Sequence, residues 1–368
     1  MNNPMQQKLI ALALASLASG AAVAQSNVTI YGIMDIGYGY YSDAPDNNVD
    51  AKSAIDSGLW KTSRFGLKGS EDLGDGLSAA FQMEFKAVPD YSAAVESRNS
   101  WVSLKKASLG EIKVGSVGSF HDDLLGATSV MFGNNTVGAP KYVYILTTGS
   151  KETTDLKNAI AYYSPSWSGF QAKLGYSTHA DTGTNDVTPT GLTGATGNER
   201  VFTAAGHYAN GPLVAGLTYE NSKYEDFDGA PDIDSGNEWH LAAAYNFGIA
   251  RVSGAYGTTS YAQNPGETKD KRKQWQIGAS TPIGSSGTLA LNYAHATIDY
   301  NTGANDDDMS FWGIGYQHSL SKRTNLYVAY GDISQDETNL VKSRLDGGTT
   351  TKNTGYQSAF NVGIRHDF

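Results

Sequence analysis

The sequence predicts an all-β protein, a transmembrane antiparallel β-barrel of sixteen strands. Three observations lead to this prediction. Apolar and polar residues alternate with a period of two in many segments. The connections between those segments are short and long in turn. Glycine and tyrosine are abundant, with 42 and 22 residues among 368, and sheet proteins with many turns use both heavily.

The first 24 residues have the layout of a cleaved secretory signal peptide. Lys8 precedes a mostly apolar run from Leu9 to Leu17, and Ala22-Val23-Ala24 offers a small-residue cleavage site. A short transmembrane or amphipathic helix is the alternative, but the run is too short to span a bilayer. We therefore expect residues 1–24 to be removed and residues 25–368 to form one exported barrel domain.

The alternating segments justify the strands one by one. In the first, Met34, Ile36 and Tyr38 alternate with Asp35 and Gly37, which gives one apolar and one polar face. The same pattern predicts strands at 27–41, 58–70, 77–88, 98–106, 111–118, 157–166, 169–178, 200–209, 212–223, 238–246, 249–261, 273–282, 287–299, 309–319, 324–334 and 356–368.

The connections between these strands alternate in length. Asn210-Gly211, between two alternating runs, is the strongest short hairpin signal. The other short connections are 71–76, 107–110, 167–168, 247–248, 283–286 and 319–323. Short periplasmic turns opposite long extracellular loops are typical of an outer-membrane barrel. A soluble β-sandwich or a solenoid is the alternative, but sandwich loops do not alternate so regularly and no internal repeat is visible.

The last strand, 356–368, indicates how the sheet closes. Its apolar face carries Phe360, Val362 and Ile364, with aromatic residues at both ends, Tyr356 and Phe368. In lipid every backbone polar group must be paired, so a sheet can span the bilayer only as a closed barrel. We therefore expect the last strand to pair with the first, with its aromatic ends in the two interfacial girdles.

Three segments resemble the general diffusion porins of Gram-negative bacteria, of the beta-proteobacterial type. These segments are NVTIYGIMDIGYGY, SRFGLKGSEDLGDGLSAAFQMEF and the terminal NVGIRHDF. The resemblance covers the whole mature chain, and the block R-x-G-x-K-G-x-E-D-L-G-x-G-L is its most specific part. It implies a homotrimer among the lipids and lipopolysaccharide of the outer membrane, which passes ions and small hydrophilic solutes. It also implies that the third long loop, 119–156, folds into the barrel and narrows it. The terminal Phe368 would be a sorting signal for the outer-membrane assembly machinery.

Charged residues at the narrowest point would set the selectivity of such a channel. Alternation turns Arg64 inward, opposite to Phe65, and Arg64 matches the arginine that opens the family's block. An arginine on the lipid face at mid-depth would cost about 2–4 kcal/mol. Alternation also turns inward Asp35, Lys68, Glu84, Lys86, Glu111, Lys113, Arg365 and Asp367.

Two more basic residues complete an expected ladder with Arg64. If Trp101 faces lipid, then Arg98, Ser100 and Val102 face inward. Lys157 stands where the resemblance implies a basic residue, usually arginine, although a solvated charge at a strand start is an equal alternative for it. The balance of inward charges favours anions at the constriction, despite a formal net charge of −10.

The third loop contains two acidic residues, Asp122 and Asp123, within HDDLLGATSVM, a predicted short helix. They suit a helix N-terminus, or one or both face the basic ladder and create a transverse field. The loop departs from the family because MFGNN replaces a Pro-Glu-Phe-Gly-Gly-like turn, and Ser116 replaces an arginine. Together the two departures remove one acid and one base from the family's constriction, so they do not decide the ion preference.

The remaining motifs exclude several functions. Asp226, Asp228, Asp232 and Asp234 lie in one acidic loop, but the key calcium-ligand positions of an EF-hand fall on Tyr224 and Ser235. We expect loosely bound divalent cations such as Ca²⁺ at most, and no cofactor. No G-x-S-x-G, H-E-x-x-H or phosphate-binding loop is present, so we expect no enzymatic activity. The acidic net charge argues against nucleic acid as a partner, and the absence of cysteine excludes thiol chemistry.

Two other functions remain open at this point. A substrate-specific channel would line its interior with a solute-binding track, for which Tyr31 and Phe311 are candidate first members. A structural or adhesive barrel would not conduct ions.

Overall fold

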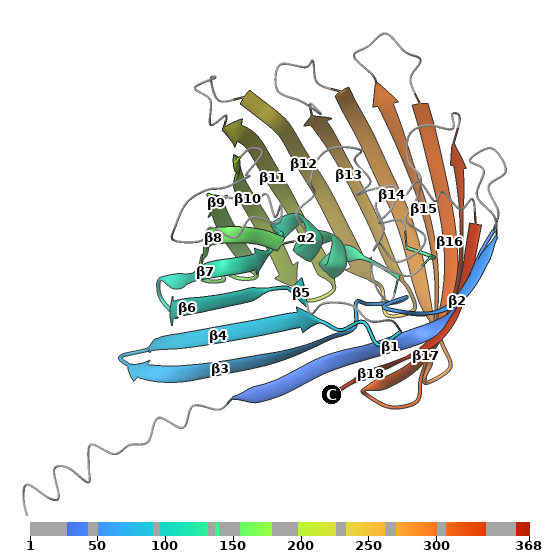
Figure 1. Ribbon diagram of the computed structural model, residues 1–368, viewed down its shortest axis with the longest axis horizontal. Coiled ribbons are helices and arrows are strands. Elements are labelled where there is room, and N and C mark those ends of the chain that lie inside the picture. Colours follow the sequence, from blue (N-terminus) through green and yellow to red (C-terminus); the bar gives the residue numbers. More distant parts are fainter. Residues whose placement is uncertain are drawn as a thin grey trace, which may run out of the picture.

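The computed structural model describes residues 28–42, 51–90, 96–131, 137–139, 155–178, 198–225, 233–261, 270–299, 307–335 and 358–368. These residues form a closed antiparallel sheet around one short helix (Figure 1). The predicted signal peptide, 1–24, and parts of the predicted constriction loop, 132–136 and 140–154, lie outside these ranges. Within the described ranges, none of the helical structure has the length and apolarity needed to cross a membrane.

The strands run in chain order around the barrel. They are β1 (Thr29–Tyr41), β2 (Lys52–Ser57), β3 (Arg64–Gly74), β4 (Leu77–Lys86), β5 (Glu96–Ser97), β6 (Ser100–Lys106), β7 (Gly110–Gly118), β8 (Asp155–Tyr163), β9 (Phe170–Ser177), β10 (Asn198–Asn210), β11 (Leu213–Glu225), β12 (Ile233–Asn246), β13 (Arg251–Tyr261), β14 (Asp270–Ile283), β15 (Gly287–Asp299), β16 (Asp307–Ser319), β17 (Thr324–Gln335) and β18 (Ser358–Asp367). The helix α2 (Phe120–Thr128) follows β7.

These eighteen segments make sixteen barrel strands, as the sequence predicts. Segments β2 and β3 pair with successive parts of β1, and β5 and β6 pair with successive parts of β4, so each couple acts as one strand. The barrel closes where β18 pairs with β1, from Ile33 opposite Asp367 to Tyr41 opposite Ala359. The predicted pairing of the last strand with the first is confirmed.

The apolar side chains lie on the outside of the barrel. On β18, Phe360, Val362 and Ile364 are 36–44% exposed, whereas Asn361 between them is fully buried. A soluble sheet would show the reverse arrangement, with its apolar face covered. This distribution is that of a barrel whose outer surface meets acyl chains.

One predicted connection is shorter than expected. The sequence predicts a connection at 71–76, but β3 continues to Gly74 and only Asp75 and Gly76 form the turn. Both turn residues have positive φ, 50° and 71°. The Asp-Gly pair adopts this left-handed conformation readily, which permits a two-residue hairpin turn.

The helix α2 lies inside the barrel against β11 and β12 (Figure 1). Ser119 caps its first turn, because the Ser119 hydroxyl accepts a hydrogen bond from the His121 N–H at 3.2 Å. Leu124 and Leu125 pack against Ala242 of β12 and Ala255 of β13. The buried apolar face of the helix therefore attaches the third loop to the inner wall.

Glycines on the inner wall make room for this loop. A Cβ on Gly216 of β11 would lie 2.7 Å from Leu124, and one on Gly331 of β17 would overlap the carbonyl oxygen of Val137. A Cβ on Gly313 of β16 would likewise overlap the backbone of Gly138. The loop therefore contacts the backbone of the wall directly at these positions.

Candidate functional site

Two arginines inside the barrel share one carboxylate. Arg64 Nη1 lies 3.1 Å and Arg98 Nε lies 2.9 Å from the same oxygen, Glu84 Oε1. The Tyr31 hydroxyl donates to the other oxygen, Glu84 Oε2, at 3.1 Å. Glu84 is only 5% exposed. Its single negative charge balances one of the two arginines, so the cluster keeps one formal positive charge.

The hairpin register brings these groups together. Arg64 is opposite Lys86, which places Glu84 of β4 opposite Gly66 of β3. Gly66 matters because the Tyr31 ring lies above it, where a Cβ would come within 2.6 Å of the ring. Arg98 joins the cluster because its backbone N–H donates to the Glu84 carbonyl oxygen at 2.8 Å.

The predicted orientation of Trp101 is wrong, although Arg98 lies inside the barrel. Val102 is 62% exposed on the outer face, and Trp101 turns inward with its ring 4.0 Å from Lys113 Nζ. Residues 98 and 99 are not part of a regular strand and separate β5 from β6. The alternation of inward and outward side chains is therefore shifted by one residue in β6. Arg98 reaches Glu84 from this irregular stretch.

Three other predicted lumen residues each have a partner. Lys68 Nζ lies 4.9 Å from the centre of the Tyr31 ring. Lys86 Nζ lies 3.4 Å from a carboxylate oxygen of Glu96. Arg365 donates two hydrogen bonds to the carboxylate of Asp367, at 2.8 and 2.7 Å. These contacts hold the cations in place along the wall.

Asp35 points into the barrel as predicted but is not exposed to the lumen. It is fully buried beneath residues 58–63, whose backbone N–H groups at Trp60 and Lys61 donate to its carboxylate. The predicted strand 58–70 is therefore wrong over 58–63, because β3 begins only at Arg64. Asp35 acts as an anchor for a bend that alternation could not reveal.

The two acids of the loop differ in their surroundings. Asp123 Oδ2 forms an ion pair with Lys173 Nζ of β9 at 3.0 Å, which fixes the start of α2 to the wall. Asp122 also lies in the first turn of α2 and interacts electrostatically with Asp155 at the start of β8. Negative charge at both positions is stabilised by the helix dipole, because both lie in the first turn.

Lys157 lies near the start of β8 and is half-buried. Asp155 interacts electrostatically with both Lys157 and Arg98. The structure therefore brings the three predicted basic residues, Arg64, Arg98 and Lys157, into one electrostatic neighbourhood with Glu84 and Asp155.

Sequence reasoning missed two attachments of α2. The His121 ring lies against the His240 ring of β12, with 3.6 Å between centroids and the ring planes tilted by 34°. Arg251 Nη2 donates to the Ala127 carbonyl oxygen at 2.6 Å. The glycine at position 257, on the neighbouring strand, is a sequence signal for the His240 contact, because a Cβ there would overlap the His240 ring. Arg251 at the C-terminal end of the helix also complements its dipole.

The structure bears on the candidate solute track but does not test the candidate metal loop. Phe311 is 1% exposed and so cannot contact a solute, and the Tyr31 hydroxyl is bonded to Glu84. The described residues contain no group of three His, Asp or Glu side chains placed to bind a metal ion. Asp226, Asp228 and Asp232, and the side chain of Asp234, lie outside the described residues.

Comparison with known proteins places the chain among porins. Residues 11–338 match the family model described as Gram-negative porin. Outer membrane porin protein 32 of Delftia acidovorans is 33% identical over 382 residues, which cover 99% of this chain and 100% of that protein. An outer membrane porin protein of Bordetella pertussis is 28% identical over 410 residues, with coverage of 99% and 100%.

Solved structures share the architecture. The anion-selective porin from Comamonas acidovorans superposes with a TM-score of 0.75 at 29% identity, covering 94% of this chain and 100% of that chain. A trimer form of OmpT from Vibrio cholerae has a TM-score of 0.68 at 18% identity, with coverage of 93% and 99%, and so shows the fold alone.

The fold, the charged interior and the family match agree. A closed barrel with an apolar outer surface crosses the membrane by its strands. The porin family's sequence model matches residues 11–338, which is most of the chain. The protein is therefore a diffusion channel of the Gram-negative outer membrane, and the chain belongs to the Gram-negative porin family.

Proposed function

We propose that this porin is a homotrimeric, water-filled general diffusion channel for ions and small hydrophilic solutes, with a weak preference for anions and no enzymatic activity. The observation that carries the proposal is the pairing of Arg64 and Arg98 with the single carboxylate of Glu84. The surplus positive charge faces a water-filled interior whose low-dielectric wall focuses its field, which raises the local concentration of anions.

The comparisons support two parts of this proposal. The Comamonas acidovorans porin, with 29% identity over nearly the whole chain, is described as anion-selective. The Vibrio cholerae OmpT barrel has been solved as a trimer, which supports a homotrimer here. A general rather than substrate-specific channel is favoured because Phe311 is covered and Tyr31 is bonded to Glu84.

The proposed partners follow from the outer-membrane location. They are outer-membrane lipids, lipopolysaccharide and the assembly machinery, with Phe368 as the sorting signal. Phe368 pairs with Gly32 through two backbone hydrogen bonds of 3.0 and 3.1 Å, while its ring is 48% exposed and so accessible. We propose no cofactor, and only loose binding of divalent cations to the acidic loop around Asp226–Asp234.

Planar-bilayer recording of the refolded protein tests this function. We expect large conductance steps that occur in threes, and a reversal potential across a KCl gradient whose sign shows a weak preference for chloride. The absence of conductance would contradict the proposal and favour a structural barrel. A small conductance blocked by trace amounts of one solute would favour a specific channel.

A further inference from the structure

Residues 58–63 leave the barrel wall between β2 and β3. Ser57 is opposite Ile36 and Arg64 is opposite Ile33 on β1. Two residues of β1 are therefore matched by six residues of the neighbouring chain. The surplus must bend away from the sheet, and Gly58 begins the bend with a φ of +74°.

The bend lies inside the barrel. Leu59 and Trp60 are each 2% exposed and pack with Tyr327 of β17. The Trp60 and Tyr327 rings meet edge to face with centroids 5.3 Å apart, and the Arg365 guanidinium of β18 lies 4.7 Å from the Trp60 ring centre. The segment 58–63 thus covers the inner faces of β17 and β18.

Asp35 fixes the tip of the bend. Its Oδ2 accepts hydrogen bonds from the backbone N–H groups of Trp60 and Lys61 at 2.7 and 2.6 Å. Its Oδ1 accepts one from the Tyr327 hydroxyl at 2.7 Å. Hydrogen bonds to an ionised carboxylate are roughly twice as strong as neutral ones. The backbone at Lys61 is therefore held rigidly relative to the wall.

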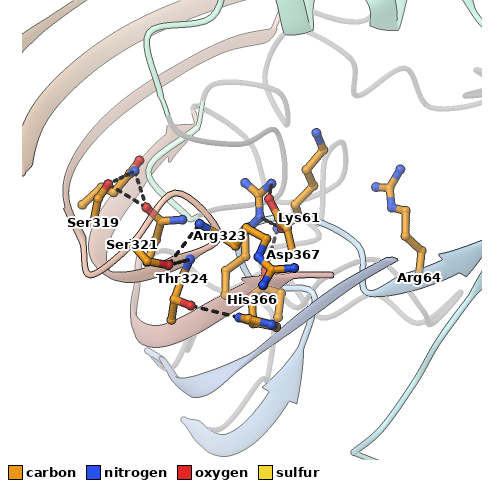
Figure 2. A network of polar contacts seen from close by, with 12 residues as sticks. Lys61, Arg64, Ser319, Ser321, Arg323, Thr324, His366 and Asp367 are labelled. Carbon is orange, nitrogen blue, oxygen red and sulfur yellow. Dashed lines mark hydrogen bonds and ion pairs between the residues drawn. The ribbon is translucent and has the colours of Figure 1, made fainter. Parts of the chain in front are cut away.

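The tip presents one charged side chain to the lumen. Gly58, Leu59, Trp60 and Ser63 are buried, whereas Lys61 is exposed. The Lys61 ammonium has no hydrogen-bond or ion-pair partner among the described residues. Figure 2 shows the side chains of Lys61 and Arg64 extending in the same direction, and the two charges interact electrostatically.

We propose that residues 58–63 form a second constriction element and that Lys61 is a specificity-determining residue that attracts small anions. This inference rests on the proposed function and deepens it. The anchored backbone fixes the point on the wall from which the Lys61 side chain extends, and Lys61 extends the basic wall from Arg64 toward Arg365. Among the described residues the Lys61 ammonium forms no close ion pair, unlike the two arginines beside Glu84, and the carboxylates of Glu84 and Asp367 act on it only at longer range.

Charge reversal at the tip tests the role of Lys61. In a gradient around 0.1 M KCl, Lys61→Glu should lower the chloride-to-potassium permeability ratio by roughly fivefold or more, with Lys61→Gln intermediate. The effect should shrink at 1 M KCl, where the Debye length is about 3 Å. Lys322→Glu, on the exposed turn between β16 and β17, makes the same charge change at the rim and should leave the ratio nearly unchanged.

A second variant tests the anchor. Asp35→Ala removes the acceptor of three hydrogen bonds and should free the bend. The unit conductance should then change, and adding Lys61→Glu should shift the selectivity less than in the parent protein. Heat-dependent gel mobility checks that the barrel has folded. If Asp35→Ala does not fold, the Lys61 variants alone decide whether the proposal holds.

The outcomes separate this inference from the function on which it rests. If the parent protein conducts as a porin but Lys61→Glu behaves like Lys322→Glu, the second constriction element is wrong and the general channel stands. If the parent protein does not conduct, the proposed function itself fails.

Discussion

Replacing Glu84 with glutamine should make the channel distinctly more selective for anions. The carboxylate now lies within 3.1 Å of both Arg64 and Arg98, and Glu84→Gln removes its charge while keeping its shape. A unit charge about 4 Å from a passing ion changes its energy by about 1 kcal/mol in water. This is about fivefold for one ion, and chloride and potassium shift in opposite directions, so we expect the chloride-to-potassium permeability ratio to rise by about fivefold or more, measured as the reversal potential across a KCl gradient.

Glu111→Gln is the matched control for this prediction. It removes the same charge from the interior at β7, where the nearest cation, Lys113, is 3.9 Å away. Its effect on the reversal potential should be smaller, because no pair of arginines is released. An equal shift in both variants, or none in Glu84→Gln, would mean that the cluster around Glu84 does not control ion passage.

Gly331→Val should displace the constriction loop. A valine side chain on β17 would overlap the carbonyl oxygen of Val137, which is itself 1% exposed. Overpacking of this kind costs about 1–3 kcal/mol, enough to move residues 137–139 off the wall toward the lumen. We expect a smaller and fluctuating single-channel current, recorded in a planar bilayer at constant voltage.

Gly254→Val controls for the loss of a strand glycine. A Cβ at Gly254 of β13 would meet only the Gln276 carbonyl oxygen, at the ordinary contact distance of 3.7 Å. Its current should match that of the parent protein. A steady current of parental size from Gly331→Val would show that the position of the loop does not depend on the contact between Val137 and Gly331.

Period-two alternation predicts the barrel well because each strand has one side in lipid and one in water. It fails at two places on the same part of the wall. At 58–63 the chain leaves the sheet because Asp35 accepts hydrogen bonds from its backbone and Tyr327 packs against Leu59 and Trp60 inside the barrel. At Arg98 and Asn99 an irregular stretch reverses the faces of Trp101 and Val102. Both depend on tertiary contacts that no local pattern contains.

The candidate site was partly accessible from sequence for a similar reason. Arg64 and Glu84 lie on adjacent strands of one hairpin, so alternation places both inside the barrel. The position of α2 on the inner wall depends instead on contacts between distant parts of the chain, such as that of His121 with His240. Inward glycines, among them Gly257 and Gly331, are a local sign of such a close approach.

The position of α2 also constrains the order in which the protein is assembled. The helix follows β7, but it rests on β10 to β13, and residues 137–139 rest on β16 and β17. All these strands come later in the chain, and contacts between distant segments form slowly. We therefore expect the loop to dock only after most of the sheet has formed. Refolding should then yield an open pore before a selective one.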